Sequence, residues 1–150
     1  MKKILVFALA MCFVLGLAFA SGALASQKDA KALVDKAAAY VKANGKDAAL
    51  KEFSKPKGQF DKGELYVFAY DLSATIVAHP KNPKLIGKNL MDVPDTDGKL
   101  FRKEIVETAK TKGSGWVDYK YQNPETKKVE AKTTYVLKVG DLVLCCGTYK

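Results

Sequence analysis

The sequence predicts an α+β fold, with N-terminal helices packed on a roughly five-stranded antiparallel sheet and a helical crossover between strands 2 and 3. Two observations carry this prediction. Apolar residues recur at helical spacing between residues 30 and 41. From residue 64 onward, most segments instead alternate with a period of two, as half-buried strands do. Helices first and strands afterwards are typical of the α+β class.

Residues 1–25 have the features of a secretory leader. Lys2 and Lys3 precede an almost uninterrupted apolar run, and Ala23-Leu24-Ala25 fits a small-x-small cleavage site. The apolar run is also just long enough for a membrane anchor, but the polar residues that follow favour cleavage after Ala25. We therefore expect a periplasmic or secreted protein with no stable membrane insertion after cleavage, folded as one domain over residues 26–150.

The chain is basic, with a formal charge of +9 that falls to +7 when the leader is removed. Its only arginine is Arg102, so the bidentate phosphate contacts of nucleic-acid readers are absent. Export and this lysine bias argue against a nucleic-acid partner. The excess charge suits a solvated surface or anionic ligands.

The predicted elements follow in order. A helix spans about residues 30–41 and ends at Asn44-Gly45, and a shorter one carries Ala49, Leu50 and Phe53. Glu64 to Asp71 predicts a strand with Tyr66, Phe68 and Tyr70 on one face, and residues 75–79 its hairpin partner. A crossover loop rich in turn residues then leads to a helix over residues 99–111.

Three further strands complete the predicted sheet. On the first, after Gly113, alternation sends Trp116 to one face and Tyr119 to the other. The second spans residues 128–139 and carries Lys132, and the third spans residues 142–149.

Ordered motifs across residues 30–149 resemble the single Cache domain of the sCache_2 type, an extracytoplasmic, PAS-like sensor domain. They are Tyr66-Val67-Phe68-Ala69-Tyr70-Asp71, His79-Pro80, Leu85-Ile86-Gly87-Lys88-Asn89, Asp97-Gly98-Lys99, Gly115-Trp116-Val117-Asp118-Tyr119, Asn123-Pro124, Lys132-Thr133-Thr134-Tyr135-Val136 and Gly147-Thr148-Tyr149. Members usually lie between two membrane helices of chemoreceptors and histidine kinases. Because this sequence stops at Lys150, we expect a stand-alone exported version that acts with a separate membrane receptor or kinase in signal transduction or chemotaxis.

The resemblance to this family implies a pocket for a small ligand. It also implies the class of ligand, a short organic anion such as a C2–C4 carboxylate. Lys132 is the candidate cation, because a lysine in mid-strand is costly unless it reaches water or meets an anion. Aromatic side chains are the candidates for the walls of this pocket. His79 is as well explained by a contact with the ligand as by packing at the end of its strand. The complete candidate set is Lys132, Trp116, Tyr119, His79, Tyr66, Phe68 and Tyr70.

Catalysis, cofactors and metals have little support in the sequence. A single histidine cannot by itself form a typical metal site. Cys145 and Cys146 are adjacent, so on a strand they point to opposite faces, and no Cys-x-x-Cys motif occurs. We expect a ligand-binding protein that is not an enzyme. The alternatives are a protein-interaction partner without a small ligand and, less favoured, a thiol or redox protein.

Overall fold

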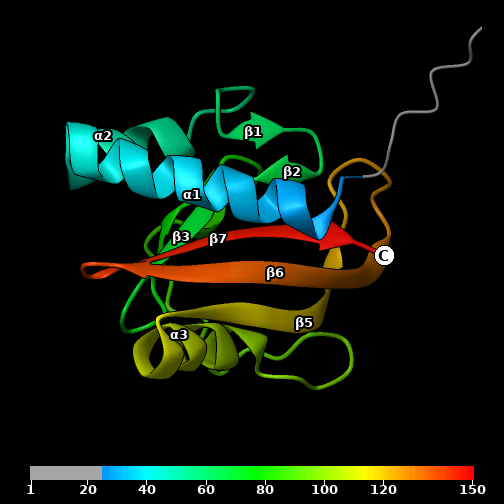
Figure 1. Ribbon diagram of the computed structural model, residues 1–150. Coiled ribbons are helices and arrows are strands. Elements are labelled where there is room, and N and C mark those ends of the chain that lie inside the picture. The colour runs from blue at the N-terminus through cyan, green and yellow to red at the C-terminus, as the bar shows by residue number, and fades with distance from the viewer. Residues whose placement is uncertain (1–24) are drawn as a thin grey trace, which may run out of the picture.

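The computed structural model describes residues 25–150, and the predicted leader lies outside the described residues except for Ala25. The chain forms three α-helices, a five-stranded antiparallel sheet and a small two-stranded sheet. Figure 1 shows α1 and α2 on one side of the large sheet and α3 on the other. This arrangement confirms the predicted α+β class and the helical crossover. In residues 25–150, no helix combines the length and apolarity required to span a membrane.

Helices α1 (Gln27–Asn44) and α2 (Lys46–Phe53) form the first layer. Ser26 caps α1 in a capping box with Asp29, which satisfies backbone donors that the first turn leaves free. Gly45 separates the two helices at a φ of 85°, a conformation that L side chains rarely adopt. The predicted apolar stripe of α1 faces the sheet and is buried at Ala30, Leu33, Val34, Ala37 and Ala38.

The large sheet has the strand order β4-β3-β7-β6-β5. Its strands are β3 (Phe68–Asp71), β4 (Ile76–Ala78), β5 (Ser114–Gln122), β6 (Val129–Val139) and β7 (Leu142–Tyr149). The central strand β7 is buried along its whole length, because helices cover both faces of the sheet. The N-terminal hairpin β3–β4 and the C-terminal strands therefore meet at β7, far apart in sequence but adjacent in space.

The segment before β3 differs from the prediction. The expected continuous strand from Glu64 is divided into β2 (Leu65–Tyr66) and β3, and β2 pairs with β1 (Asp61–Lys62) in the small sheet. At the division, the backbone N–H of Val67 donates to the carbonyl of Phe60 at 2.9 Å. The chain thus changes partner without reversing the alternation, so Tyr66 and Phe68 still face the same side.

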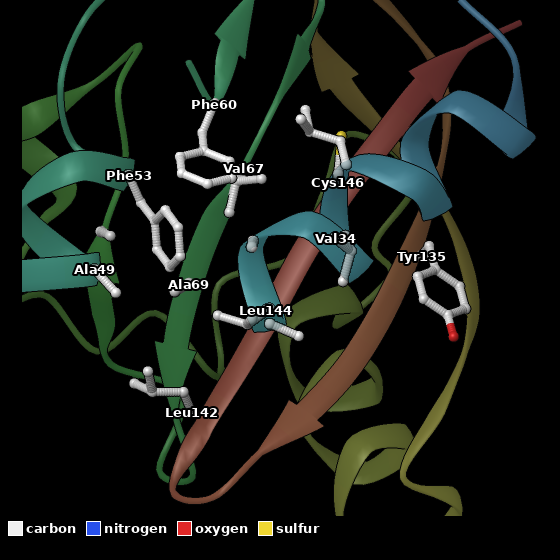
Figure 2. Close-up of a cluster of buried hydrophobic side chains, with 14 of the residues drawn as sticks. Val34, Ala49, Phe53, Phe60, Val67, Ala69, Tyr135, Leu142, Leu144 and Cys146 are labelled. Atoms are coloured by element: carbon white, nitrogen blue, oxygen red, sulfur yellow. The ribbon is translucent and has the colours of Figure 1, made fainter. Parts of the chain in front are cut away.

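Two hydrophobic cores lie on opposite faces of the sheet. The first fills the space under α1 and α2 and includes the perpendicular rings of Phe53 and Phe60, with centroids 4.8 Å apart (Figure 2). The second lies under α3 (Phe101–Lys112) and the crossover that contains the 3₁₀ turn η1 (Pro83–Leu85). The first core is largely aliphatic, whereas the second contains most of the buried tyrosines and the polar groups described next.

Candidate ligand-binding site

A nearly closed cavity lies in the second core, between the sheet, α3 and the crossover. Its free volume is about 10 Å³, which is room for about one water molecule. Its walls are mainly aromatic and contain two cationic side chains. The lining residues are Tyr66, Phe68, Tyr70, Ile76, His79, Leu85, Phe101, Arg102, Tyr119, Tyr121 and Lys132. Six of the seven candidate residues are therefore together in one place, and the exception is Trp116.

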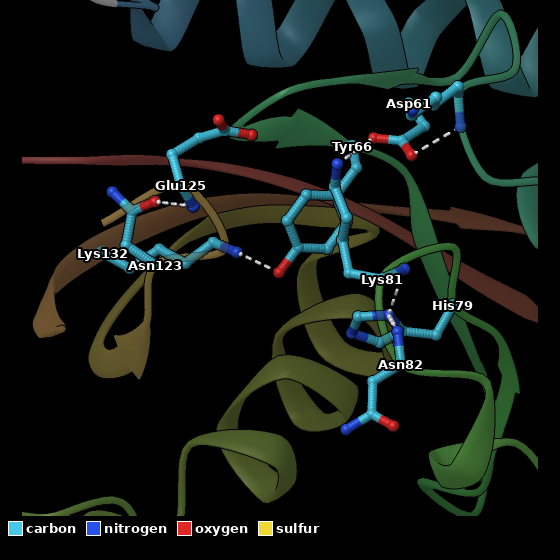
Figure 3. Close-up of polar contacts among 9 residues, drawn as sticks. Asp61, Tyr66, His79, Lys81, Asn82, Asn123, Glu125 and Lys132 are labelled. Carbon is cyan, nitrogen blue, oxygen red and sulfur yellow. Dashed lines mark hydrogen bonds and ion pairs between the residues drawn. The ribbon is translucent and has the colours of Figure 1, made fainter. Parts of the chain in front are cut away.

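Lys132 extends from β6 into this cavity and is only 1% exposed. Its Nζ donates hydrogen bonds to the hydroxyls of Tyr66 at 3.0 Å and Tyr149 at 3.4 Å, and the first is drawn in Figure 3. It also lies 4.4–5.5 Å from the ring centroids of Tyr66, Tyr149, Phe68 and Tyr121, within cation–π range. Burial lowers the pKa of Lys132 to about 8, so at neutral pH it remains mostly protonated.

A glycine on the neighbouring strand makes room for this lysine. Gly147 on β7 pairs with Thr134, and a Cβ atom at this position would lie 2.6 Å from Cε of Lys132 and 2.3 Å from Oγ1 of Thr134. Both distances are shorter than side chains tolerate. The lysine can therefore cross over β7 only because residue 147 has no side chain.

Arg102 is the second buried cation, and it is not among the site residues predicted from the sequence. It is 6% exposed, lies in the first turn of α3, and donates from Nη1 to the carbonyl of Val93 at 3.1 Å. Its guanidinium is 4.2 Å from the ring centroid of Phe101, and its buried Nε has no hydrogen-bond partner. Two features of the sequence could have indicated that Arg102 is buried. It is the only arginine, and it lies four residues before the apolar Val106, which places both on the same face of a helix.

His79 is buried against the same aromatic wall as a neutral imidazole. Its Nδ1 accepts the backbone N–H groups of Lys81 at 3.2 Å and Asn82 at 3.1 Å, which places the ring proton on Nε2 (Figure 3). Burial, together with the charges of Lys132 and Arg102, lowers the pKa of His79 to about 3. The ring centroids of Tyr66 and Phe68 lie 5.3 and 5.8 Å away. His79 thus both packs and organises the loop that follows β4.

Tyrosine hydroxyls supply the remaining polar surface of the cavity. Tyr119 stacks on Phe101 with centroids 4.1 Å apart and shares a 2.9 Å hydrogen bond with Thr134. Burial raises the pKa of Tyr66, Tyr70 and Tyr119 well above the ordinary value, so these phenols stay protonated. The cavity consequently offers hydroxyl groups and two cations, while its tyrosines contribute no negative charge.

Trp116 requires a correction. It lies on the opposite face of β5, is 38% exposed, and packs on Tyr135 with centroids 5.2 Å apart. Trp116 and Tyr119 are three positions apart on one strand, and an odd offset places them on opposite faces, so they cannot face the same cavity. Trp116 is therefore removed from the candidate site.

The other chemical groups give no indication of a metal or redox centre. Within residues 25–150, no group of three His, Cys, Asp or Glu side chains is placed to hold a metal ion. Cys145 and Cys146 are free thiols that are fully buried on opposite sides of the sheet, in the second and first core respectively. Burial raises the pKa of both, that of Cys146 to about 12, which disfavours the reactive thiolate.

The fold is that of a PAS-like sensor domain, with a small closed cavity between the sheet, α3 and the crossover. The chain belongs to the Single Cache domain 2 family, whose model matches residues 18–149. The family consists of extracytoplasmic, non-catalytic sensor modules. This membership confirms the resemblance that the ordered sequence motifs indicated.

Relatives with known context are signalling receptors. The chain is 32% identical over 83 residues to the sensor histidine kinase MctS of Rhizobium johnstonii, covering 55% of this chain and 18% of the relative. It is 32% identical over 86 residues to the methyl-accepting chemotaxis protein McpP of Pseudomonas putida, covering 56% of this chain and 16% of that protein. The matched part is thus less than one fifth of either curated relative.

Solved structures agree with this assignment. A Cache chemosensory domain, described as showing the structural basis for carboxylic acid recognition, aligns with a TM-score of 0.69 and 28% identity. The alignment covers 81% of this chain and 91% of that one. The periplasmic sensor domain of a chemotaxis protein aligns with a TM-score of 0.64 and 28% identity, over 81% of this chain and 88% of that chain.

Proposed function

We propose that this domain binds a short organic anion, a carboxylate of two to four carbons, in the cavity of the second core. The carboxylate would accept hydrogen bonds from Lys132 and Arg102, with the Nε2–H of His79 as a neutral third donor. Tyr66, Phe68, Tyr70 and Tyr119 would enclose the carbon chain. The carboxylic acid recognition described for a related Cache chemosensory domain supports the same ligand class.

The observation that carries the proposal is a pair of buried cations without an anionic partner. In the described part of the chain, neither Lys132 nor Arg102 forms an ion pair, and the nearby buried carboxylate of Asp61 is bound to Lys81 at 2.7 Å. An isolated buried charge is expensive, and one way to lower the cost is to bind an opposite charge. The unpartnered Nε of Arg102 gives the anion a free donor.

Binding must widen the cavity, because even a two-carbon acid is larger than the one water molecule that fits. The crossover supplies the least regular wall, through Leu85 in the 3₁₀ turn. An outward shift of this wall on ligand binding would change the outer surface of the domain. Such a shift is how we envisage that ligand occupancy is communicated to a partner.

We further propose that the protein is exported with cleavage after Ala25 and presents its ligand state to a membrane chemoreceptor or histidine kinase. The receptor and kinase context of its relatives supports this partner class. Intact-mass measurement of the exported protein should give a chain that starts at Ser26. A chain retaining residues 1–25 in the membrane fraction would contradict the export proposal.

Calorimetry with a panel of two- to four-carbon acids tests the ligand proposal, on protein never exposed to carboxylate buffers. A charge-assisted hydrogen bond contributes about 1.5–3 kcal/mol, so Lys132→Met and Arg102→Met should each weaken binding by roughly ten- to a hundredfold. Lys138→Met, at an exposed position on the same strand, is the matched control and should bind like the parent. If no acid produces heat or a thermal shift, the domain is instead an interaction partner without a small ligand.

A further inference from the structure

We propose that the ligand enters the buried cavity through a portal between the loop at residues 79–82 and the β5–β6 hairpin loop, with Tyr121 as the gate. This inference rests on the proposed function, because it takes the cavity to be the binding site. A second, more open cavity of about 140 Å³ lies directly outside the first. We call it the vestibule.

The vestibule and the buried cavity share a wall. Tyr66, His79 and Tyr121 line both spaces, so a change at any of the three side chains can connect them. Lys81 and Asn82 form one rim of the vestibule, and Gln122, Pro124 and Lys127 form the other. Figure 3 shows Tyr66 and Lys132 between the loop that carries Lys81 and the hairpin loop that carries Asn123.

Tyr121 is the least buried of the three side chains in this wall, and it is held by ring contacts with Phe101 and Tyr119, whose centroids are each 6.1 Å away. Tyr66 is 2% exposed and its hydroxyl is bound to Lys132, while His79 is held by two backbone N–H groups. Tyr121 is only partly buried and is the last residue but one of β5, which ends at Gln122 where the hairpin loop begins. Rotation of its side chain would join the vestibule to the cavity at the cost of ring contacts with Phe101, Tyr119 and Lys132, while the hydrogen bonds of Tyr66 and His79 stay in place.

Ion pairs and hydrogen bonds hold the backbone of both rims in place. We therefore expect the portal to open by movement of a side chain and not of the backbone. On one side, the ion pair between Lys81 and the buried Asp61 anchors the loop after His79. On the other, buried Asn123 closes the hairpin: its backbone N–H donates to the carbonyl of Lys128 at 2.8 Å, and its carbonyl accepts from Lys127 at 2.9 Å.

The charge at the rims suits the proposed ligand. Lys127 lies on one rim, Lys81 on the opposite rim is paired with Asp61, and the inner cations Lys132 and Arg102 lie behind the shared wall without an ion pair. Positive charge that increases along a narrow path attracts an anion from solution and guides it inward. The structure therefore provides an entrance as well as a binding cavity for a small carboxylate.

Cysteine labelling at the rims tests the portal. Asn82→Cys and Lys127→Cys place exposed thiols on opposite rims, and a bulky maleimide should react there because the native Cys145 and Cys146 are fully buried. Lys138→Cys, at the far end of β6, removes the same charge as Lys127→Cys and serves as the control. The ligand probe is propionate, and NMR line-shape analysis of its signals yields the association rate, the dissociation rate and the Kd.

Obstruction of a path raises the barrier equally in both directions. Labels at residues 82 and 127 should therefore slow association and dissociation by about tenfold each and leave the Kd within about threefold, whereas the label at residue 138 should change none of these. Unchanged rates in both rim-labelled proteins would overturn the portal, as would a change in Kd without matching changes in both rates. Propionate that fails to bind even the unlabelled parent, together with silence across the acid panel, would refute the proposed function itself.

Discussion

Replacing Lys132 by methionine should weaken anion binding by roughly ten- to a hundredfold and, at the same time, stabilise the unliganded protein. Methionine is close in length to lysine and can fill the aromatic cage without a charge. The charged Nζ is buried and has no carboxylate partner within residues 25–150. The substitution therefore removes an uncompensated charge from the second core.

The expected gain can be estimated from the lowered pKa. Burial moves the pKa of Lys132 from 10.5 to about 8, and each unit corresponds to about 1.4 kcal/mol, so the charged form costs the fold about 3 kcal/mol at pH 7. The variant also deprives the Tyr66 hydroxyl of a donor at 3.0 Å, a loss of about 1 kcal/mol. We expect the variant to be more stable than the parent by about 2 kcal/mol at pH 7.

The pH dependence of the stability difference shows whether the buried charge of Lys132 is its cause. Below pH 8 the lysine is protonated in both the folded and the unfolded chain, and the cost is fully present. Between pH 8 and 10.5 the unfolded chain binds more protons than the folded one, so the parent gains about 1.4 kcal/mol per pH unit. The buried thiols of Cys145 and Cys146 act in the opposite direction in both proteins, because burial raises the pKa of each, and the variant removes only the smaller lowering effect of the Lys132 charge on them.

Urea unfolding of parent and variant at pH 7, 8 and 9.5, without carboxylate in the buffer, measures this difference. The advantage of the variant should be largest at pH 7 and should shrink towards zero near pH 10. Ligand at one fixed, saturating concentration should stabilise the parent by about 1.4–2.7 kcal/mol more than the variant, which corresponds to the ten- to hundredfold difference in Kd. A variant that is less stable than the parent at pH 7, by an amount independent of pH, would refute the reasoning.

Three further outcomes are expected. Replacing Cys145 and Cys146 together by alanine should leave affinity within about tenfold, on the order of 1.4 kcal/mol by calorimetry, and loss of all binding would contradict their packing role. Gly147→Ala should abolish binding in the same assay, because its Cβ would come within 2.6 Å of Cε of Lys132. Affinity should be flat from pH 5.5 to 7.5 and fall above pH 8, since His79 stays neutral and Lys132 loses its proton; a step near pH 6.5 would show that His79 titrates.

Strand alternation was the most reliable signal in the sequence. It placed Tyr66, Phe68 and Tyr70 on one face, as the structure has them, and it separated Cys145 from Cys146. Alternation depends only on the geometry of a single strand, so it holds wherever the strand exists. The same rule places Trp116 and Tyr119 on opposite faces of their strand. The prediction that both line one pocket was therefore inconsistent with the alternation.

Arg102 could not be assigned in the same way. Its burial depends on how α3 is rotated over the sheet and on where the crossover carries Val93, whose carbonyl receives its Nη1. Neither is determined by helical periodicity, which only places Phe101, Ile105 and Ala109 on one stripe. For the same reason, the division between β2 and β3 was not predicted, because it depends on the pairing of β2 with a two-residue strand.

The charges in the cavity destabilise the folded protein, and the proposed function gives a reason for that cost. Three basic side chains border the cavity, and a structure optimised for stability alone would bury none of them as cations. The double acceptor role of Nδ1 keeps His79 neutral, so the site contains two positive charges and one neutral donor. Lys132 loses its proton only above neutral pH, because burial lowers its pKa to about 8. Under the proposed function, an anion in the cavity would offset the cost of these two charges at neutral pH, and the energy released on binding would be available to move the wall that encloses the ligand.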